Sequence, residues 1–276
     1  MTIADPTPVA EPKPAASVLL VRESAPGAAE PVEVYMIRRQ KTMQLLGGFY
    51  AFPGGKVDAS DAAPDVMARC VGLDAAGAER IFPASAGRPA LAYWATAVRE
   101  LLEETGVLYA CDAAGRAIDA SLPHFDAVVE RARQALVTKA TTFGALLATH
   151  DWHCDLRPMR YLSHFTTPRT SPIRFSARFF LCPVPAGQTP RLITEETSEG
   201  FWIHPGEGYR RFGAGEMAMA EPAEYGLAYL AQFDSLADIW AAHVDGAAKM
   251  SGIVDRIEFW SDFDWTKVSW RKPQPR

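Results

Sequence analysis

The stretch RELLEETGV occupies residues 99–107 and carries the strongest fold signal in the chain. On a helix, Glu100, Glu103 and Glu104 lie three and four residues apart, so their carboxylates share one face. Neighbouring carboxylates repel one another unless a cation holds them, and a hard divalent ion such as Mg²⁺ prefers oxygen ligands of this kind. Taken alone, the pattern is also typical of a solvated acidic helix face, so the neighbouring sequence matters.

The same stretch predicts a long helix over residues 92–105. Its other face carries apolar side chains that can dock the helix on a sheet, namely Ala97, Val98, Leu101 and Leu102. Gly106 follows and predicts the end of the helix, because glycine readily adopts the left-handed conformation that closes one. Strand-like runs are mixed with helix-like runs along the chain, which indicates an α+β or α/β/α domain; the runs lie at 16–22, 32–38, 159–166 and 174–183.

A glycine-rich segment, FPGGKVD, lies upstream at residues 52–58. Pro53, Gly54 and Gly55 predict a turn. Glycines also let the backbone approach a neighbouring group closely, so a backbone carbonyl of this turn can complete a metal shell.

Together the two segments resemble the signature of the Nudix hydrolases, G-x5-E-x7-R-E-U-x-E-E-x-G-U, in which U is a bulky aliphatic residue. Gly55 takes the first position, Asp61 replaces the first glutamate, and residues 99–107 fit every specified position of the second half. Between Asp61 and Arg99 lie 37 residues where the signature has 7, so 30 are extra. A branch of the family with such an insert includes mammalian peroxisomal enzymes that hydrolyse coenzyme A and acyl-CoA.

The resemblance covers roughly residues 15–240 and implies an α/β fold, the Nudix-type α/β/α sandwich with a mixed sheet and a helical insert. It divides the chain into a flexible lead over 1–14, a Nudix domain over 15–245 that contains the insert at 62–92, and an aromatic-rich tail over 246–276. Further helices are predicted over 63–71, 74–81, 125–137, 143–150, 221–232 and 236–243.

The resemblance also implies metal-dependent attack of water on a diphosphate, with Mg²⁺ or Mn²⁺ as cofactor. By the family pattern, Glu100 and Glu104 are metal ligands, Glu103 is a further ligand or the base, and the Gly54 carbonyl is a backbone ligand. Arg99 corresponds to an orienting arginine, which we expect to pair with Asp61.

Coenzyme A is the substrate that the resemblance favours, within the wider class of nucleoside diphosphates linked to another group. Residues 39–55 match in part a pattern of coenzyme A hydrolases, with Gln40 and Gln44 departing from it. The 3′-phosphate and diphosphate of coenzyme A call for arginine or lysine, and the candidates are Arg38, Arg39, Lys41, Arg174 and Arg178. Arg39 holds the matching position and is predicted to contact the 3′-phosphate.

Alternative functions are ADP-ribose, NADH or nucleotide-sugar hydrolysis, or a Nudix-fold module that senses a nucleotide without turnover. The intact group of three glutamates argues against a pure binding module. Glu196 and Glu199 are candidates for one extra carboxylate of the kind that many family members bring from a late loop, although they also fit a solvated acidic turn.

Composition excludes several other classes. The net charge of −5 gives no global basic field for nucleic acid, and no apolar run reaches the ~20 residues that span a membrane. The 4 cysteines show neither CxxC nor zinc spacing, so we expect free thiols in a reducing cytoplasm. The N-terminal residues lack the features of a signal peptide. The aromatic tail predicts packing on the body or on a partner subunit, the latter as a homodimer.

Overall fold

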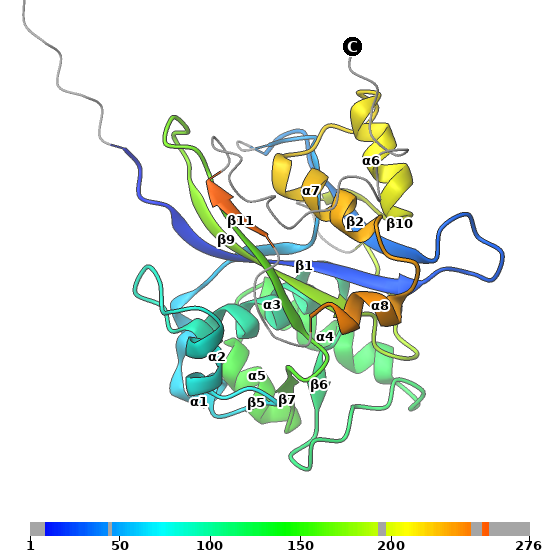
Figure 1. Cartoon of the computed structure of the whole chain (residues 1–276). Coiled ribbons are helices and arrows are strands. Elements are labelled where there is room, and N and C mark those ends of the chain that lie inside the picture. The colour runs from blue at the N-terminus through cyan, green and yellow to red at the C-terminus, as the bar shows by residue number, and fades with distance from the viewer. Residues whose placement is uncertain (1–8, 44–45, 193–196, 244–249, 254–276) are drawn as a thin grey trace, which may run out of the picture.

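A mixed β-sheet runs through the middle of the computed structural model (Figure 1). The structure describes residues 9–43, 46–192, 197–243 and 250–253. Within them, the main sheet contains β1 (Lys13–Glu23), β2 (Val32–Arg39), β3 (Tyr50–Ala51), β4 (Gly54–Lys56), β8 (Arg160–Thr166), β9 (Phe175–Pro183), β10 (Thr197–Ile203) and β11 (Met250–Ile253). Their order is β10-β2-β1-β9-β8-β11, with β3 beside β2 and β4 beside β1. Strand β1 is parallel to β9 and antiparallel to β2 and β4, so the sheet is mixed.

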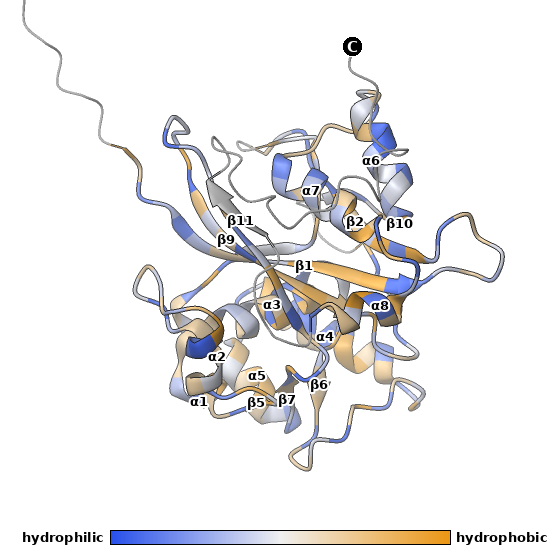
Figure 2. Cartoon of the chain, viewed as in Figure 1, coloured by the Kyte–Doolittle hydropathy of each residue, from blue (hydrophilic) through white to orange (hydrophobic). Residues whose placement is uncertain are grey.

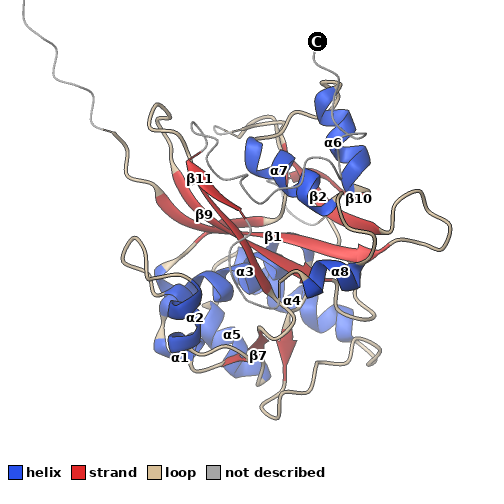
Figure 3. Cartoon of the chain, viewed as in Figure 1, coloured by secondary structure: helices blue, strands red, loops and turns tan. Residues whose placement is uncertain are grey.

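Helices cover both faces of this sheet (Figure 3). One face carries the 3₁₀ turn η1 (Ala59–Ala62), α1 (Pro64–Met67), α2 (Ala75–Ile81), α3 (Ala90–Thr105), α4 (Phe125–Val137) and α5 (Phe143–His150). The other face carries α6 (Pro205–Gly213), α7 (Glu221–Leu230) and α8 (Leu236–Ala241). A second sheet, in the order β5-β7-β6, joins β5 (Cys70–Val71), β6 (Ala110–Cys111) and β7 (His153–Asp155). The predicted α/β/α sandwich is confirmed.

Strand β1 shows why the sheet is buried on both faces. Val18 and Leu20 point to the α3 layer, whereas Leu19 and Val21 point to the α7 layer, and all four are 0% exposed. Its continuous apolar run is visible as an orange band in Figure 2. A continuous run suits a central strand that is covered on both faces, whereas alternating apolar and polar residues suit a strand with one solvent-exposed face. No helix in the described part of the chain is both long and apolar enough to cross a membrane.

Helix α3 docks on this sheet through its apolar face, because Ala97, Val98, Leu101 and Leu102 are all buried in the same core cluster. The helix begins at Ala90, two residues before the predicted start, and ends where predicted. Gly106 closes it with a φ of 69°. Its length and its glycine stop follow directly from the sequence.

Three local predictions were wrong. Pro53–Gly55 is not simply a turn, because Gly54–Lys56 forms strand β4 and pairs with residues 15–17 of β1. The helix predicted over 63–71 ends at Met67, and Cys70–Val71 instead pairs with β7. Helix α6 was missed because its sequence, PGEGYRRFG, is rich in glycine. Its first turn is stabilised by Glu30, which accepts hydrogen bonds from the N–H groups of Gly206 and Glu207.

The insert packs on the Nudix helix, as expected for a segment whose two ends return to one site. Both α1 and α2 contact α3, and Val66, Ala78 and Phe82 enter the core cluster beneath it. Strand β1 already begins at Lys13, inside the predicted lead. Except for β11, the predicted aromatic tail lies outside the described residues.

Candidate active site

Strand β4 brings two glycines against the carboxylates of α3. The Gly54 N–H donates a hydrogen bond to Glu104 Oε2 at 2.8 Å. Gly55 lies so close to Glu100 that a Cβ at this position would clash with its carboxylate. Gly54 has a φ of 149°, and a Cβ there would clash with the backbone of β1 at Ala16. Glycine at both positions is therefore what allows the strand to approach the glutamates.

Arg99 holds the start of the insert and the glutamates together. Its Nε and Nη2 donate to Asp61 Oδ1 and Oδ2 at 2.8 and 3.0 Å, and Nη2 also donates to the Lys56 carbonyl at 2.9 Å. Nη1 lies 2.9 Å from both Glu100 Oε1 and Glu103 Oε2. The predicted pairing of Arg99 with Asp61 is confirmed, because η1 places Asp61 directly beneath the helix despite the long insert.

Further hydrogen bonds fix the buried Asp61 carboxylate, which is 0% exposed. Thr96 Oγ1 and the Asp58 N–H donate to its Oδ2 at 2.8 and 2.9 Å. Thr96 lies one turn before Arg99, so both donors come from one face of α3. Thr96 was not predicted as a site residue, although a hydroxyl three residues before an orienting arginine is a usable signal.

Burial and the neighbouring charges shift the pKa values of Glu100, Glu103 and Arg99. Burial raises the pKa of Glu100 to about 7, against the opposing charge of Arg99 and with a further increase from Glu103. Burial also raises the pKa of Glu103, again against Arg99. For Arg99, burial lowers the pKa, but Glu100, Asp61 and Glu103 outweigh it and the net pKa is raised. Arg99 is thus a permanent cation among its carboxylates.

The donor set fits a hard divalent cation, because α3 offers three carboxylates on one face and the backbone of β4 lies against two of them. The side chains that would hold it are Glu100, Glu103 and Glu104. Two of these carboxylates instead contact Arg99 and one contacts Gly54, and within the described residues no three His, Cys, Asp or Glu side chains are gathered as a metal site. Gly54 contacts Glu104 through its N–H, and its carbonyl stays a predicted ligand.

Arg39 and Arg38 end β2 on opposite faces of the sheet. Tyr35 and Ile37 point to the α3 layer, and alternation places Arg39 on the same face as the glutamates. Arg38 points the other way, lies over the Tyr50 ring at 5.1 Å and pairs with Glu199 at 2.8 Å. Arg39 therefore lies on the α3 side of the sheet, and its contact with a phosphate stays a prediction.

The other two predicted arginines differ from each other. Arg174 is 8% exposed and donates to the carbonyls of Thr167 and Ala10 at 3.0 and 2.8 Å, so it ties the start of β9 to the loop before it and to the residues before β1. Arg178 lies on β9 paired with Ala16 of β1, which is itself paired with Gly55. Arg178 therefore shares a row and a face of the sheet with the glycine that contacts Glu100.

The two late carboxylates were predicted as a pair of candidates. Glu196 lies outside the described residues. Glu199 lies on β10, and its carboxylate is 47% exposed and paired with Arg38 on the face opposite the α3 glutamates. The described structure therefore does not bring Glu199 to the site.

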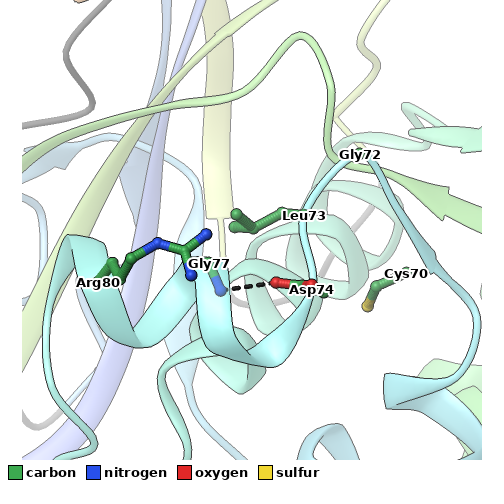
Figure 4. Close-up of a pocket in the computed structure, with 6 residues that line it drawn as sticks. All are labelled: Cys70, Gly72, Leu73, Asp74, Gly77 and Arg80. Carbon is green, nitrogen blue, oxygen red and sulfur yellow. Dashed lines mark hydrogen bonds between the residues drawn. The ribbon is translucent and has the colours of Figure 1, made fainter.

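The insert also bears a pocket of about 420 Å³ that involves none of the predicted site residues. Figure 4 shows its lining, which includes the start of α2 where the Gly77 N–H donates to Asp74. Its wall includes Cys70, one of four cysteines that are all free thiols, as predicted.

Comparison with known proteins agrees with this geometry. The family model described as the NUDT19 Nudix domain matches residues 12–230. The protein named "Putative nudix hydrolase 7" of Caenorhabditis elegans is 29% identical over 199 residues, which are 72% of this chain and 56% of that protein. The crystal structure of a NUDIX hydrolase from Alicyclobacillus acidocaldarius is 31% identical and superposes with a TM-score of 0.67, covering 84% of this chain and 96% of that one. The chain belongs to the Nudix hydrolases, in the family of the NUDT19 Nudix domain.

Proposed function

We propose that the chain is a Mg²⁺- or Mn²⁺-dependent diphosphatase that cleaves coenzyme A or acyl-CoA. The observation that carries the proposal is that Glu104 and Glu100 lie against the Gly54–Gly55 backbone, while Glu103 and Glu100 contact Arg99, which is anchored on Asp61. A helix face with three carboxylates is otherwise unfavourable, and a divalent cation is the partner that such a donor set suits.

Each residue of the site has a separate role in the proposed reaction. A bound divalent cation supplies charge neutralisation for the diphosphate and lowers the pKa of its bound water. Glu103 is more exposed than the other two glutamates, so its carboxylate is the one placed to accept a proton from the attacking water. Arg99 fixes the orientation of Glu103 through Nη1, and Asp61 fixes Arg99. Gly54 and Gly55 keep β4 close enough to hold Glu104 and Glu100.

Coenzyme A is favoured among the diphosphates because arginines flank the glutamates on one face of the sheet. Arg39 lies at the end of β2 and Arg178 lies on β9, on either side of β4. Guanidinium groups suit phosphate oxygens, and coenzyme A has more of these than ADP-ribose or NADH because of its 3′-phosphate. The cleavage products would be adenosine 3′,5′-bisphosphate and phosphopantetheine, or acyl-phosphopantetheine from acyl-CoA.

A substrate panel tests this proposal. Coenzyme A, an acyl-CoA, ADP-ribose and NADH are incubated with the full chain and Mg²⁺ or Mn²⁺, and the products are resolved by mass spectrometry. We expect the highest kcat/KM with coenzyme A or acyl-CoA. A preference for ADP-ribose or NADH would overturn the substrate, and binding of nucleotides without turnover of any of them would instead support a sensing module.

A further inference from the structure

Arg178 is a buried cation for which the described part of the chain provides no hydrogen-bond partner at two of its three nitrogens. Its residue is 5% exposed, and both Nε and Nη1 are buried with no hydrogen-bond partner among the described residues. None of the carboxylates that the structure describes forms an ion pair with it. Burial lowers the pKa of Arg178, against the influence of Tyr161 and Tyr93. A charged side chain in this condition is costly, so an anion that enters the site would gain a strong interaction.

Aromatic rings of the insert and of α3 hold this guanidinium in place. Its Cζ lies 4.8 Å from the ring centroid of Phe82 and 5.5 Å from that of Tyr93. Phe82 in turn stacks on Trp94 at 4.9 Å and is 6% exposed. These contacts stabilise the cation without neutralising it, because a ring face offers no full negative charge. The guanidinium is therefore held in place while its charge stays unneutralised by these rings.

Polar groups surround Arg178 on the same face of the sheet. His164 on β8 is its direct strand partner, and His164 Nε2 lies 2.8 Å from Ser176 Oγ. Beyond them the face turns apolar with Phe180, which packs under α3. The turn that carries Arg88 is joined to Tyr93 through the Ser85 carbonyl, and Arg88 Nε is likewise buried without a partner in the described chain. Arg178 on the sheet and Arg88 on the insert thus each have a buried guanidinium nitrogen without a partner among the described residues.

Two independent backbone spacings give the distance between the Arg178 site and the α3 glutamates. Gly55, Ala16 and Arg178 form one row on adjacent strands, and two strand spacings amount to about 10 Å. Tyr93 and Glu100 lie on the same side of α3, about two helical turns or about 10 Å apart. An anion at Arg178 is therefore separate from a diphosphate at the glutamates, yet within the length of one nucleotide.

We propose that Arg178, caged by Phe82 of the insert and Tyr93 of α3, binds a second anionic group of the substrate, a phosphate monoester about 10 Å from the cleaved diphosphate. The inference rests on the proposed function and assigns the 3′-phosphate of coenzyme A to Arg178 rather than to Arg39. It also gives the insert a role, since the insert supplies the ring that lies nearest the guanidinium.

Paired ligands that differ only in this phosphate test the proposal. Calorimetry measures binding of adenosine 3′,5′-bisphosphate and of adenosine 5′-monophosphate to the wild type and to Arg178→Gln. We expect the wild type to bind the bisphosphate about ten- to a hundredfold more tightly, because a charge-assisted hydrogen bond has that value, and the variant to lose the difference. A bisphosphate preference that persists in Arg178→Gln, or a wild type with no preference, would overturn it.

Kinetics with coenzyme A and 3′-dephospho-coenzyme A extend the test to the proposed reaction. The ratio of the two KM values should approach one in Arg178→Gln, whereas Arg22→Gln should keep the wild-type ratio. Arg22 is a matched control, because its guanidinium also lies over an aromatic ring, Trp202 at 4.2 Å, but is paired with Glu33 far along β1. A wild type that hydrolyses both substrates with equal KM would refute only the Arg178 site, whereas one that hydrolyses no diphosphate would refute the proposed function.

Discussion

Two buried arginines on the α3 side of the sheet, Arg99 on α3 and Arg178 on β9, have opposite surroundings. Arg99 is 6% exposed and contacts three carboxylates and a carbonyl, whereas Arg178 is 5% exposed and lies against two rings. The surrounding carboxylates raise the pKa of Arg99, whereas burial lowers the pKa of Arg178. A paired guanidinium orders its neighbours, whereas an unpaired one keeps its hydrogen-bonding capacity for a ligand. The comparison therefore separates a positioning arginine from a binding one.

The largest expected effect is on stability and sets the two arginines apart. Arg99→Met leaves the buried Asp61 carboxylate without its cation, so unfolding should cost about 3–5 kcal/mol less. Arg178→Met removes a charge that pairs with no carboxylate of the described residues, so the free energy of unfolding should be unchanged or higher. Chemical denaturation followed by circular dichroism measures both.

The double variant Arg99→Met/Asp61→Asn sharpens this result. It removes both buried charges together and should recover part of the unfolding free energy that Arg99→Met loses. Equal destabilisation by Arg99→Met and Arg178→Met would break the comparison, because it would show that Arg178 has a structural partner.

The next effect concerns the glutamates that surround Arg99. Glu103→Gln and Glu104→Gln should each lower kcat by at least about 100-fold, because each removes charge that a hard cation or a water molecule needs. Steady-state kinetics at saturating Mg²⁺ checks this. Glu207→Gln on α6 is the matched control, since Glu207 is a helical glutamate paired with Arg210 on the other face of the sheet. A glutamate variant with near-wild-type kcat would remove that residue from the site.

A smaller effect decides between Arg39 and Arg178. If Arg178 binds the 3′-phosphate, Arg39→Ala should raise KM for coenzyme A and 3′-dephospho-coenzyme A alike, by about tenfold, through the diphosphate that both substrates share. An increase in KM confined to coenzyme A would instead assign 3′-phosphate binding to Arg39, as the sequence alone predicts. Product analysis of the same reactions shows whether the cleaved bond has changed.

The smallest effect is on acid stability through His164, the strand partner of Arg178. Burial, and then the charge of Arg178, lower the pKa of His164 from 6.5 to about 4. The unfolded chain therefore takes up the proton first, and stability is lost as pH falls from about 6.5 towards 4. Ser176 and Thr166 also face this imidazole and carry no charge. We expect His164→Gln to reduce the loss of unfolding free energy between pH 7 and pH 5 by about 1–2 kcal/mol.

Denaturation midpoints of the wild type and His164→Gln at the two pH values measure this effect. An identical acid dependence in both proteins would contradict the burial of a neutral His164 beside Arg178. Glutamine is the suitable replacement because its amide keeps a polar atom near Ser176 and does not titrate.

The paired arginine could be predicted from the sequence, but the unpaired one could be predicted only in part. The spacing of the glutamates, the apolar face of α3 and the stop at Gly106 are local properties, and they survive the long insert. The partner of Arg99 was found because Asp61 keeps its position in a known signature. Arg178 was selected as an arginine near phosphate, yet its isolation depends on Phe82 and Tyr93, which belong to distant segments.

Local signals were also misread where tertiary contacts override propensity. Gly54 and Gly55 were read as a turn, but pairing with β1 makes them a strand. The glycines of α6 argue against a helix, yet Gly208 packs tightly on Leu227 and Glu30 caps the first turn. In both cases the decisive partner lies far away in the sequence.

The central claim is that the three glutamates of α3 hold a divalent cation at the Gly54–Gly55 backbone. Electron paramagnetic resonance of free Mn²⁺ measures this directly, in titrations of the wild type, Glu103→Gln, Glu104→Gln and the control Glu207→Gln. We predict that the wild type and the control deplete the free Mn²⁺ signal alike, and that each site variant binds Mn²⁺ at least about tenfold more weakly. Mn²⁺ binding by both site variants that equals that of the wild type would contradict the account.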